Sequence, residues 1–120
     1  MQMKGHDIQA KRWFYWIPAV AYMGLIFFLS SQSFLPTPVE FPNADKVLHM
    51  GEYGILSGLL VLPGLPPFAA FTAASAYGAT DEFHQRFVPG RDGNLWDWAA
   101  DATGAFLASA MLFLWQRHRS

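Results

Sequence analysis

The chain has 120 residues, of which 52% are hydrophobic, 17% aromatic and 14% charged. Soluble domains carry about a quarter charged residues, so this composition is typical of a membrane protein, and the length fits one domain over residues 1–120. The absence of cysteine from the sequence excludes disulfides and thiol chemistry, and the net charge of −1 is close to zero. We expect no nucleic acid as a partner.

The first predicted membrane helix covers residues 13–31, which read WFYWIPAVAYMGLIFFLSS and contain no charge. About 20 apolar residues span a hydrocarbon core of roughly 30 Å, and the aromatic cluster at the start suits the interface. A signal peptide is the alternative, but the apolar stretch is too long for one and no small-residue cleavage site stands out. We expect Pro18, one turn in, to kink the entry.

A proline-rich connection leads to the second predicted helix, residues 45–62. Asp45, His49 and Glu52 fall within an arc of about 60° on this helix, and three glycines share the opposite side. Two of these glycines, Gly54 and Gly58, form a small-xxx-small pattern that lets another helix approach closely. An oligomer through Gly54 and Gly58 is therefore one expectation.

The third predicted helix covers residues 68–86, after the breaker PGLPP. Its uncharged part, Phe68 to Thr80, is short for a membrane span, but we expect the polar end to extend the helix into the headgroup region. Tyr77, Asp81 and His84 follow an i, i+4, i+7 pattern, which places them in a stripe on one face.

The fourth predicted helix covers residues 94–116 and follows a turn that contains one proline and two glycines. Asn94, Asp97, Asp101 and Gly104 repeat the same helical offset and form a third polar stripe. Tryptophans flank the apolar part at both ends, as is typical of a membrane anchor.

Four spans place both termini on the same side of the membrane, and charge indicates which side. The basic residues of the terminal side are Lys4, Lys11, Arg12, Arg117 and Arg119, against Asp7 alone. The positive-inside rule then places both termini in the cytoplasm. We therefore predict an all-α fold: a polytopic protein of the bacterial cytoplasmic membrane, a four-transmembrane-helix bundle in which the polar stripes of helices 2, 3 and 4 meet near the outer leaflet.

Ionisable groups at this depth need an explanation, because each acid inside a bilayer costs about 2.5 to 3.5 kcal/mol. One interpretation is that the stripes only hold the helices together, through hydrogen bonds of about 0.6 kcal/mol each. We favour an outward-facing functional pocket, the usual meaning of intramembrane ionisable residues.

The polar motifs also carry a resemblance. DKVLHMGEY at 45–53, DEFHQRFVPGRDGNLWDWAADATG at 81–104 and SSQS at 30–33 resemble the VanZ-like family of small bacterial membrane proteins, over about residues 24–113. The resemblance implies a polytopic helical membrane protein and a link to low-level teicoplanin resistance. It also implies that the recurrent polar positions of the family fall on Asp45, Lys46, His49, Glu52, Tyr53, Asp81, Glu82, His84, Gln85, Pro89, Gly90, Arg91, Asp97 and Asp101.

Acid/base chemistry would use a histidine that titrates near neutrality beside a carboxylate. The candidate catalytic residues are His49, Glu52, Asp81, His84 and Asp101. The candidate binding residues are Asp45, Lys46, Tyr53, Tyr77, Glu82, Gln85, Arg91 and Asp97. Lysine and arginine among them suit the phosphate or carboxylate groups of an envelope lipid.

A metal site is an alternative for the same residues. His49-x-x-Glu52 and Asp81-x-x-His84 resemble the pairs of acid and histidine in di-metal helical bundles. Those sites need carboxylates on two further helices, and the first helix offers none. We therefore expect neither a metal nor another cofactor.

We predict a membrane protein that binds or acts on envelope lipid or lipid-linked cell-wall material. The expected partners are membrane lipids and either a lipid-linked precursor or a glycopeptide. A membrane-embedded hydrolase or transferase that uses His and Asp is the first alternative. A proton-coupled transporter is the second.

Overall fold

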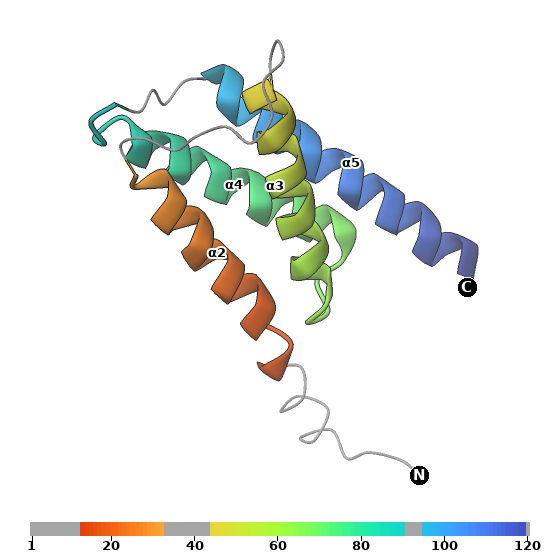
Figure 1. Ribbon diagram of the computed structural model, residues 1–120. Coiled ribbons are helices and arrows are strands. Elements are labelled where there is room, and N and C mark those ends of the chain that lie inside the picture. The colour runs from red at the N-terminus through yellow and green to blue at the C-terminus, as the bar shows by residue number, and fades with distance from the viewer. Residues whose placement is uncertain (1–12, 33–43, 91–94, 120) are drawn as a thin grey trace.

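The computed structural model describes residues 13–32, 44–90 and 95–119. Within these ranges the chain forms four α-helices and no strand (Figure 1), which confirms the predicted all-α fold. The helices are α2 (Ile17–Ser30), α3 (Ala44–Val61), α4 (Pro67–Gln85) and α5 (Leu95–Arg119).

The first and last helices differ from their predicted bounds. α2 begins at Ile17 instead of residue 13, and Trp13 and Phe14 belong to a separate helical turn before it. Pro18 lies in the first turn of α2, where its missing N–H has no partner to lose. Pro18 therefore marks the start of α2, and a kink of the entry stays a prediction. α5 continues past residue 116 to Arg119.

The bundle is built on the pair α3 and α5, which cross closely because of Gly104. A Cβ at position 104 would lie 2.0 Å from the carbonyl oxygen of Met50, so glycine is required there. Gly54 also meets Gly104 across this crossing, whereas Gly58 has open space around it. The small-xxx-small pattern thus serves, at Gly54, a contact within the chain. α4 packs on both helices of the pair, and α2 lies against α3 and α4 (Figure 1).

One end of the bundle gathers four helix ends. The end of α2, the start of α3, the end of α4 and the start of α5 all lie at the upper end in Figure 1. The tight turn from α3 to α4 lies at the other end, and Gly64 adopts a φ of 119° within it. The predicted polar stripes of three helices therefore start from a common end of the bundle.

The interior mixes apolar and polar side chains, and many large hydrophobic side chains are exposed at the surface. The apolar core consists of a few residues, with Tyr53 and Leu56 at its centre and alanines around them. Buried polar residues are as prominent, and Asp101 is fully buried. Large hydrophobic side chains point outward from every helix, among them Phe28, Ile55, Phe83, Phe106 and Leu114.

Of the described helices, α5 is the one that is long and apolar enough to cross a membrane, with 25 residues. α2 is apolar but has 14 residues, about 21 Å at 1.5 Å per residue. Length and composition therefore support one span among the described helices, and the crossing of all four stays a prediction.

Candidate functional site

Three ionisable side chains from three different helices converge near the gathered end of the bundle. His49 of α3, Glu82 of α4 and Asp101 of α5 each offer a donor atom within 4.8 Å of the other two. The His49 Nδ1 atom lies 2.7 Å from Asp101 Oδ1 and 3.8 Å from Glu82 Oε1. We call these residues the carboxylate–histidine cluster.

The carboxylate–histidine cluster is enclosed by the helices. Glu82 and Asp101 are 6% and 0% exposed. Both carboxylate oxygens of Glu82, and Asp101 Oδ2, are buried without a hydrogen-bond partner. Since a buried polar group without a partner costs about 1–3 kcal/mol, this cluster is expensive as a purely structural feature.

A second group of polar side chains surrounds Asp81. Its Oδ1 accepts a hydrogen bond from Ser30 of α2, and its Oδ2 accepts one from the hydroxyl of Tyr53 at 3.1 Å. Gln85 in turn donates to the Ser30 hydroxyl at 3.2 Å. This group joins α2, α3 and α4, and it gives Asp81 two donors where Glu82 has none.

Lys46 lies at the edge of the site and is 31% exposed. Its ammonium group contacts Asp45 at 2.8 Å and Asp97 at 2.5 Å, and so it ties the start of α3 to the first turn of α5. Asp45 is itself 58% exposed. Lys46 is therefore already neutralised by these two acids.

Glycine creates the space that the buried acids occupy. A Cβ at Gly78 would lie 3.1 Å from Asp101 Oδ2 and 3.3 Å from the ring of Tyr53. Gly78 and Glu82 are one turn apart on α4, so the same face accommodates Asp101 and supplies the second carboxylate.

Most of the predicted residues lie in or beside these groups. The stripe of Asp97, Asp101 and Gly104 is buried, as predicted, whereas Asn94 and Arg91 lie outside the described residues. On α3, Glu52 is half-buried and is not one of the converging residues, because the buried face of that helix is centred on Tyr53 and Leu56.

The predicted stripe of α4 contacts α2 in addition to α3, where Tyr53 donates to Asp81 and its ring lies 6.5 Å from that of Tyr77. The hydroxyl of Tyr77 donates to the Met23 carbonyl at 2.6 Å, and the His84 ring stacks on Phe27 at 4.4 Å. Both partners belong to α2, for which the sequence indicated no polar role. It is Glu82, next to Asp81, that points towards α3 and α5.

Two contributors were missed because of their small size. Ser30 belongs to the SSQS motif but received no role, and Gly78 was not singled out. For Gly78 the sequence gives one local signal, its spacing: it lies three positions before Asp81 and four before Glu82, on the same helix face. That Ser30 of α2 donates to Asp81 requires knowledge of how the helices pair.

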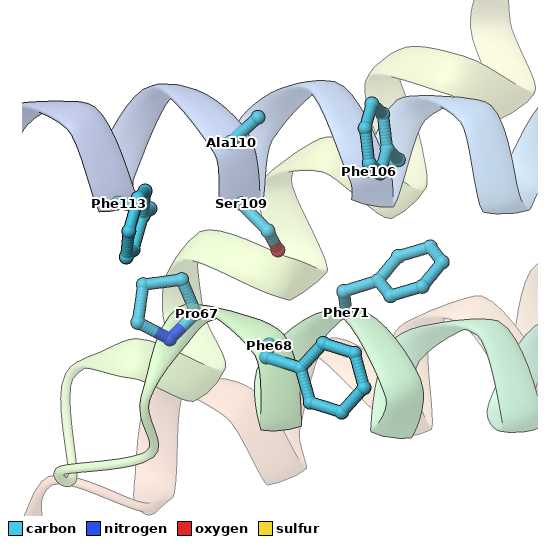
Figure 2. A pocket seen from close by; sticks show the side chains of 7 residues that line it. All are labelled: Pro67, Phe68, Phe71, Phe106, Ser109, Ala110 and Phe113. Carbon is cyan, nitrogen blue, oxygen red and sulfur yellow. The ribbon is translucent and has the colours of Figure 1, made fainter.

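An apolar pocket of about 340 Å³ lies between α4 and α5, nearer the other end of the bundle (Figure 2). Phe71 and Phe106 meet edge to face at one side of it, with centroids 5.8 Å apart. Pro67, Phe68, Ser109, Ala110 and Phe113 complete the lining. Its chemistry suits a hydrocarbon chain.

A profile of the VanZ/LLP1 family matches residues 5–116, nearly the whole chain. The chain belongs to the VanZ/LLP1 family. Membership confirms the suspected VanZ-like resemblance and brings the association of that family with glycopeptide resistance. Searches of curated proteins and of solved structures gave no match. The geometry of this VanZ/LLP1 site therefore has to be interpreted from its own residues.

Proposed function

We propose that this VanZ/LLP1 protein crosses the membrane with all four helices and binds or modifies an envelope lipid or a lipid-linked cell-wall component, and that it thereby lowers susceptibility to teicoplanin. The observation that carries the proposal is the polar site, with its buried carboxylates, inside a bundle whose outer surface is apolar. Such an arrangement is stable in hydrocarbon, and intramembrane ionisable groups usually mark function.

The short helices do not oppose four spans. Helices shorter than the hydrocarbon thickness are accommodated by thinning of the bilayer and by flanking aromatic side chains. The cost is fractions of a kcal/mol per ångström of mismatch. Trp13, Phe14 and Trp16 lie before α2 and are exposed, and Trp115 lies near the end of α5. These residues suit the two interfaces.

The proposed orientation places the polar site at the outer side. Arg117 and Arg119 lie at the end of α5, away from the carboxylate–histidine cluster, and the basic residues at positions 4, 11 and 12 belong to the same predicted side. Basic residues favour the cytoplasmic face.

Two sites on α4 and α5 support a lipid as the ligand. Phe71 in the apolar pocket precedes Asp81 by ten positions, about 15 Å along a helix. A lipid whose headgroup lies near the polar site has a tail that reaches this depth. Lys46 at the edge supplies a cation for a phosphate, if the phosphate displaces the carboxylate of Asp45 or Asp97.

The test is protection of a susceptible bacterium that expresses the protein. Asp101→Asn keeps the shape of the side chain and removes its charge, so it should abolish protection against teicoplanin. Leu112→Ala is the matched control, because it deletes packing on α5 away from the cluster and should lower the melting temperature while protection remains. Full protection by Asp101→Asn at normal protein levels contradicts a functional polar site.

A membrane-embedded hydrolase or transferase is the second candidate, and the pairing of His49 with Asp101 favours it. A carboxylate within 2.7 Å of an imidazole nitrogen orients the ring and supports its use as a base. Purified protein incubated with lipid-linked cell-wall precursor should then release a product detectable by mass spectrometry, and His49→Gln should stop that release.

A further inference from the structure

The carboxylate–histidine cluster holds more negative than positive charge in a confined space. Glu82 and Asp101 bring two carboxylates, and His49 brings at most one positive charge. Lys46, the nearest basic side chain on α3, contacts Asp45 and Asp97 instead. Burial of a carboxylate without compensation is strongly unfavourable. When both carboxylates are ionised, the cluster therefore suits a positively charged ligand.

The unpartnered atoms point to the same conclusion. Glu82 is buried to more than nine-tenths, and neither of its carboxylate oxygens has a hydrogen-bond partner. Asp101 Oδ2 is in the same situation. By contrast Asp81, next to Glu82 in sequence, receives hydrogen bonds at both oxygens. A buried carboxylate oxygen without a partner among the protein side chains needs a shared proton, a water or an ion, and the convergence of His49 on the same carboxylates suits an ion.

We propose that His49, Glu82 and Asp101 bind a divalent transition-metal ion of the Zn²⁺ or Mn²⁺ type. Metal–ligand distances of about 2.0–2.2 Å place neighbouring donor atoms about 3–3.5 Å apart. The separations of 2.7 Å and 3.8 Å from His49 Nδ1 bracket that range, and all three donor atoms lie within 4.8 Å of one another, so side-chain shifts of about an ångström complete the site.

The donor set selects the class of ion. Mg²⁺ and Ca²⁺ prefer oxygen ligands alone, whereas Zn²⁺ and Mn²⁺ accept imidazole together with carboxylates. Two carboxylates and a neutral imidazole neutralise a divalent ion. Three protein ligands also leave a coordination position for water or for an oxygen of a bound molecule.

The proposed ligands differ from the ligand set considered from sequence. The pairs His49-x-x-Glu52 and Asp81-x-x-His84 share only His49 with the cluster. The earlier expectation rested on the lack of carboxylates on the first helix, but α3, α4 and α5 suffice for three ligands. The metal site concerns the same cluster as the proposed function and does not require lipid binding.

The test uses the full chain, purified in detergent, stripped with chelator and titrated with Zn²⁺ alone. Calorimetry should give one Zn²⁺ per chain, and the melting temperature should rise with Zn²⁺ concentration, because the ion binds the assembled site. Glu82→Gln and His49→Gln should each weaken binding at least tenfold. Thr103→Val changes an exposed residue of α5 outside the cluster and should bind as the parent does.

Co²⁺ provides a spectroscopic check on the ligands. The parent loaded with Co²⁺ should show a visible absorption band, and His49→Gln should alter it. If the parent binds no Zn²⁺ above the level of Glu82→Gln, or if both variants bind Zn²⁺ like the parent, the metal site is wrong. Loss of teicoplanin protection in Glu82→Gln without Zn²⁺ binding by the parent would likewise reject the metal while the proposed function stands.

Discussion

Gly104 of α5 meets the backbone of Met50 of α3 so closely that a Cβ at position 104 would fall 2.0 Å from the Met50 carbonyl oxygen. Backbone cannot yield as the end of a flexible side chain can. The closest pair of helices in the bundle, and with it the separation of His49 from Asp101, depends on this glycine.

Gly104→Ala should therefore destabilise the bundle by about 1–3 kcal/mol or more, because the two helices must separate. Gly58→Ala is the control, since a Cβ there meets nothing within 4 Å. Melting in detergent, followed by circular dichroism, measures both variants. Equal melting temperatures for the two variants would show that the crossing does not need Gly104.

Gly78→Ala tests the space around Asp101. The added Cβ would lie 3.1 Å from Asp101 Oδ2 and 3.3 Å from Tyr53, tighter than ordinary contact but with side chains that can shift. We expect a modest loss of stability and a full loss of teicoplanin protection, because Asp101 moves relative to His49. Gly24→Ala, in open space on α2, should change neither property. A Gly78→Ala protein that protects cells fully would contradict this role.

The two donors to Asp81 should act together. Each single variant, Tyr53→Phe or Ser30→Ala, leaves the Asp81 carboxylate one of its two hydrogen bonds. The double variant removes both. We expect the double variant to lose more stability than the sum of the single changes, by about 0.5–3 kcal/mol. A double-mutant cycle on melting free energies measures this coupling, and simple additivity would argue against a shared network.

Orientation can be tested with single cysteines, because the sequence contains none. Phe87→Cys lies just after α4 at the polar end and replaces a residue that is 71% exposed. An impermeant thiol reagent should label it in whole cells. Leu65→Cys, in the turn between α3 and α4, should be labelled only after the cells are opened. The reverse pattern would place the polar site inside the cell.

The sequence predicted helix existence and most bounds, since proline and glycine clusters separate the apolar runs. It also identified the buried stripe of α5, where Asp97, Asp101 and Gly104 keep one period along an uninterrupted helix. Periodicity within one helix does not say which neighbour a face meets. That is why the contacts of Tyr77 and His84 with α2 were not expected, although Tyr77 also lies beside Tyr53 of α3.

Assignments on α3 show the same limit at finer scale. The stripe of Asp45, His49 and Glu52 is rotated relative to the face that is buried, which runs through Tyr53, Leu56 and Leu60. His49 lies at the overlap of the two faces and so joins the site, whereas Asp45 is exposed. The sequence assigned Glu82 to binding. Its place in the cluster depends on Gly78, one turn earlier on α4, which leaves room for Asp101. The sequence alone does not show that Asp101 lies against Gly78.

The cluster also constrains how the protein is made. Its three members lie at positions 49, 82 and 101, and the last of them belongs to the final helix. With all four helices crossing the membrane as proposed, His49 and Glu82 would enter the insertion machinery before Asp101 has left the ribosome, and their polar groups would have no final partner at that stage. Assembly of the site must therefore wait for the last helix, and a chain truncated before Asp101 should be a substrate for membrane quality-control proteases.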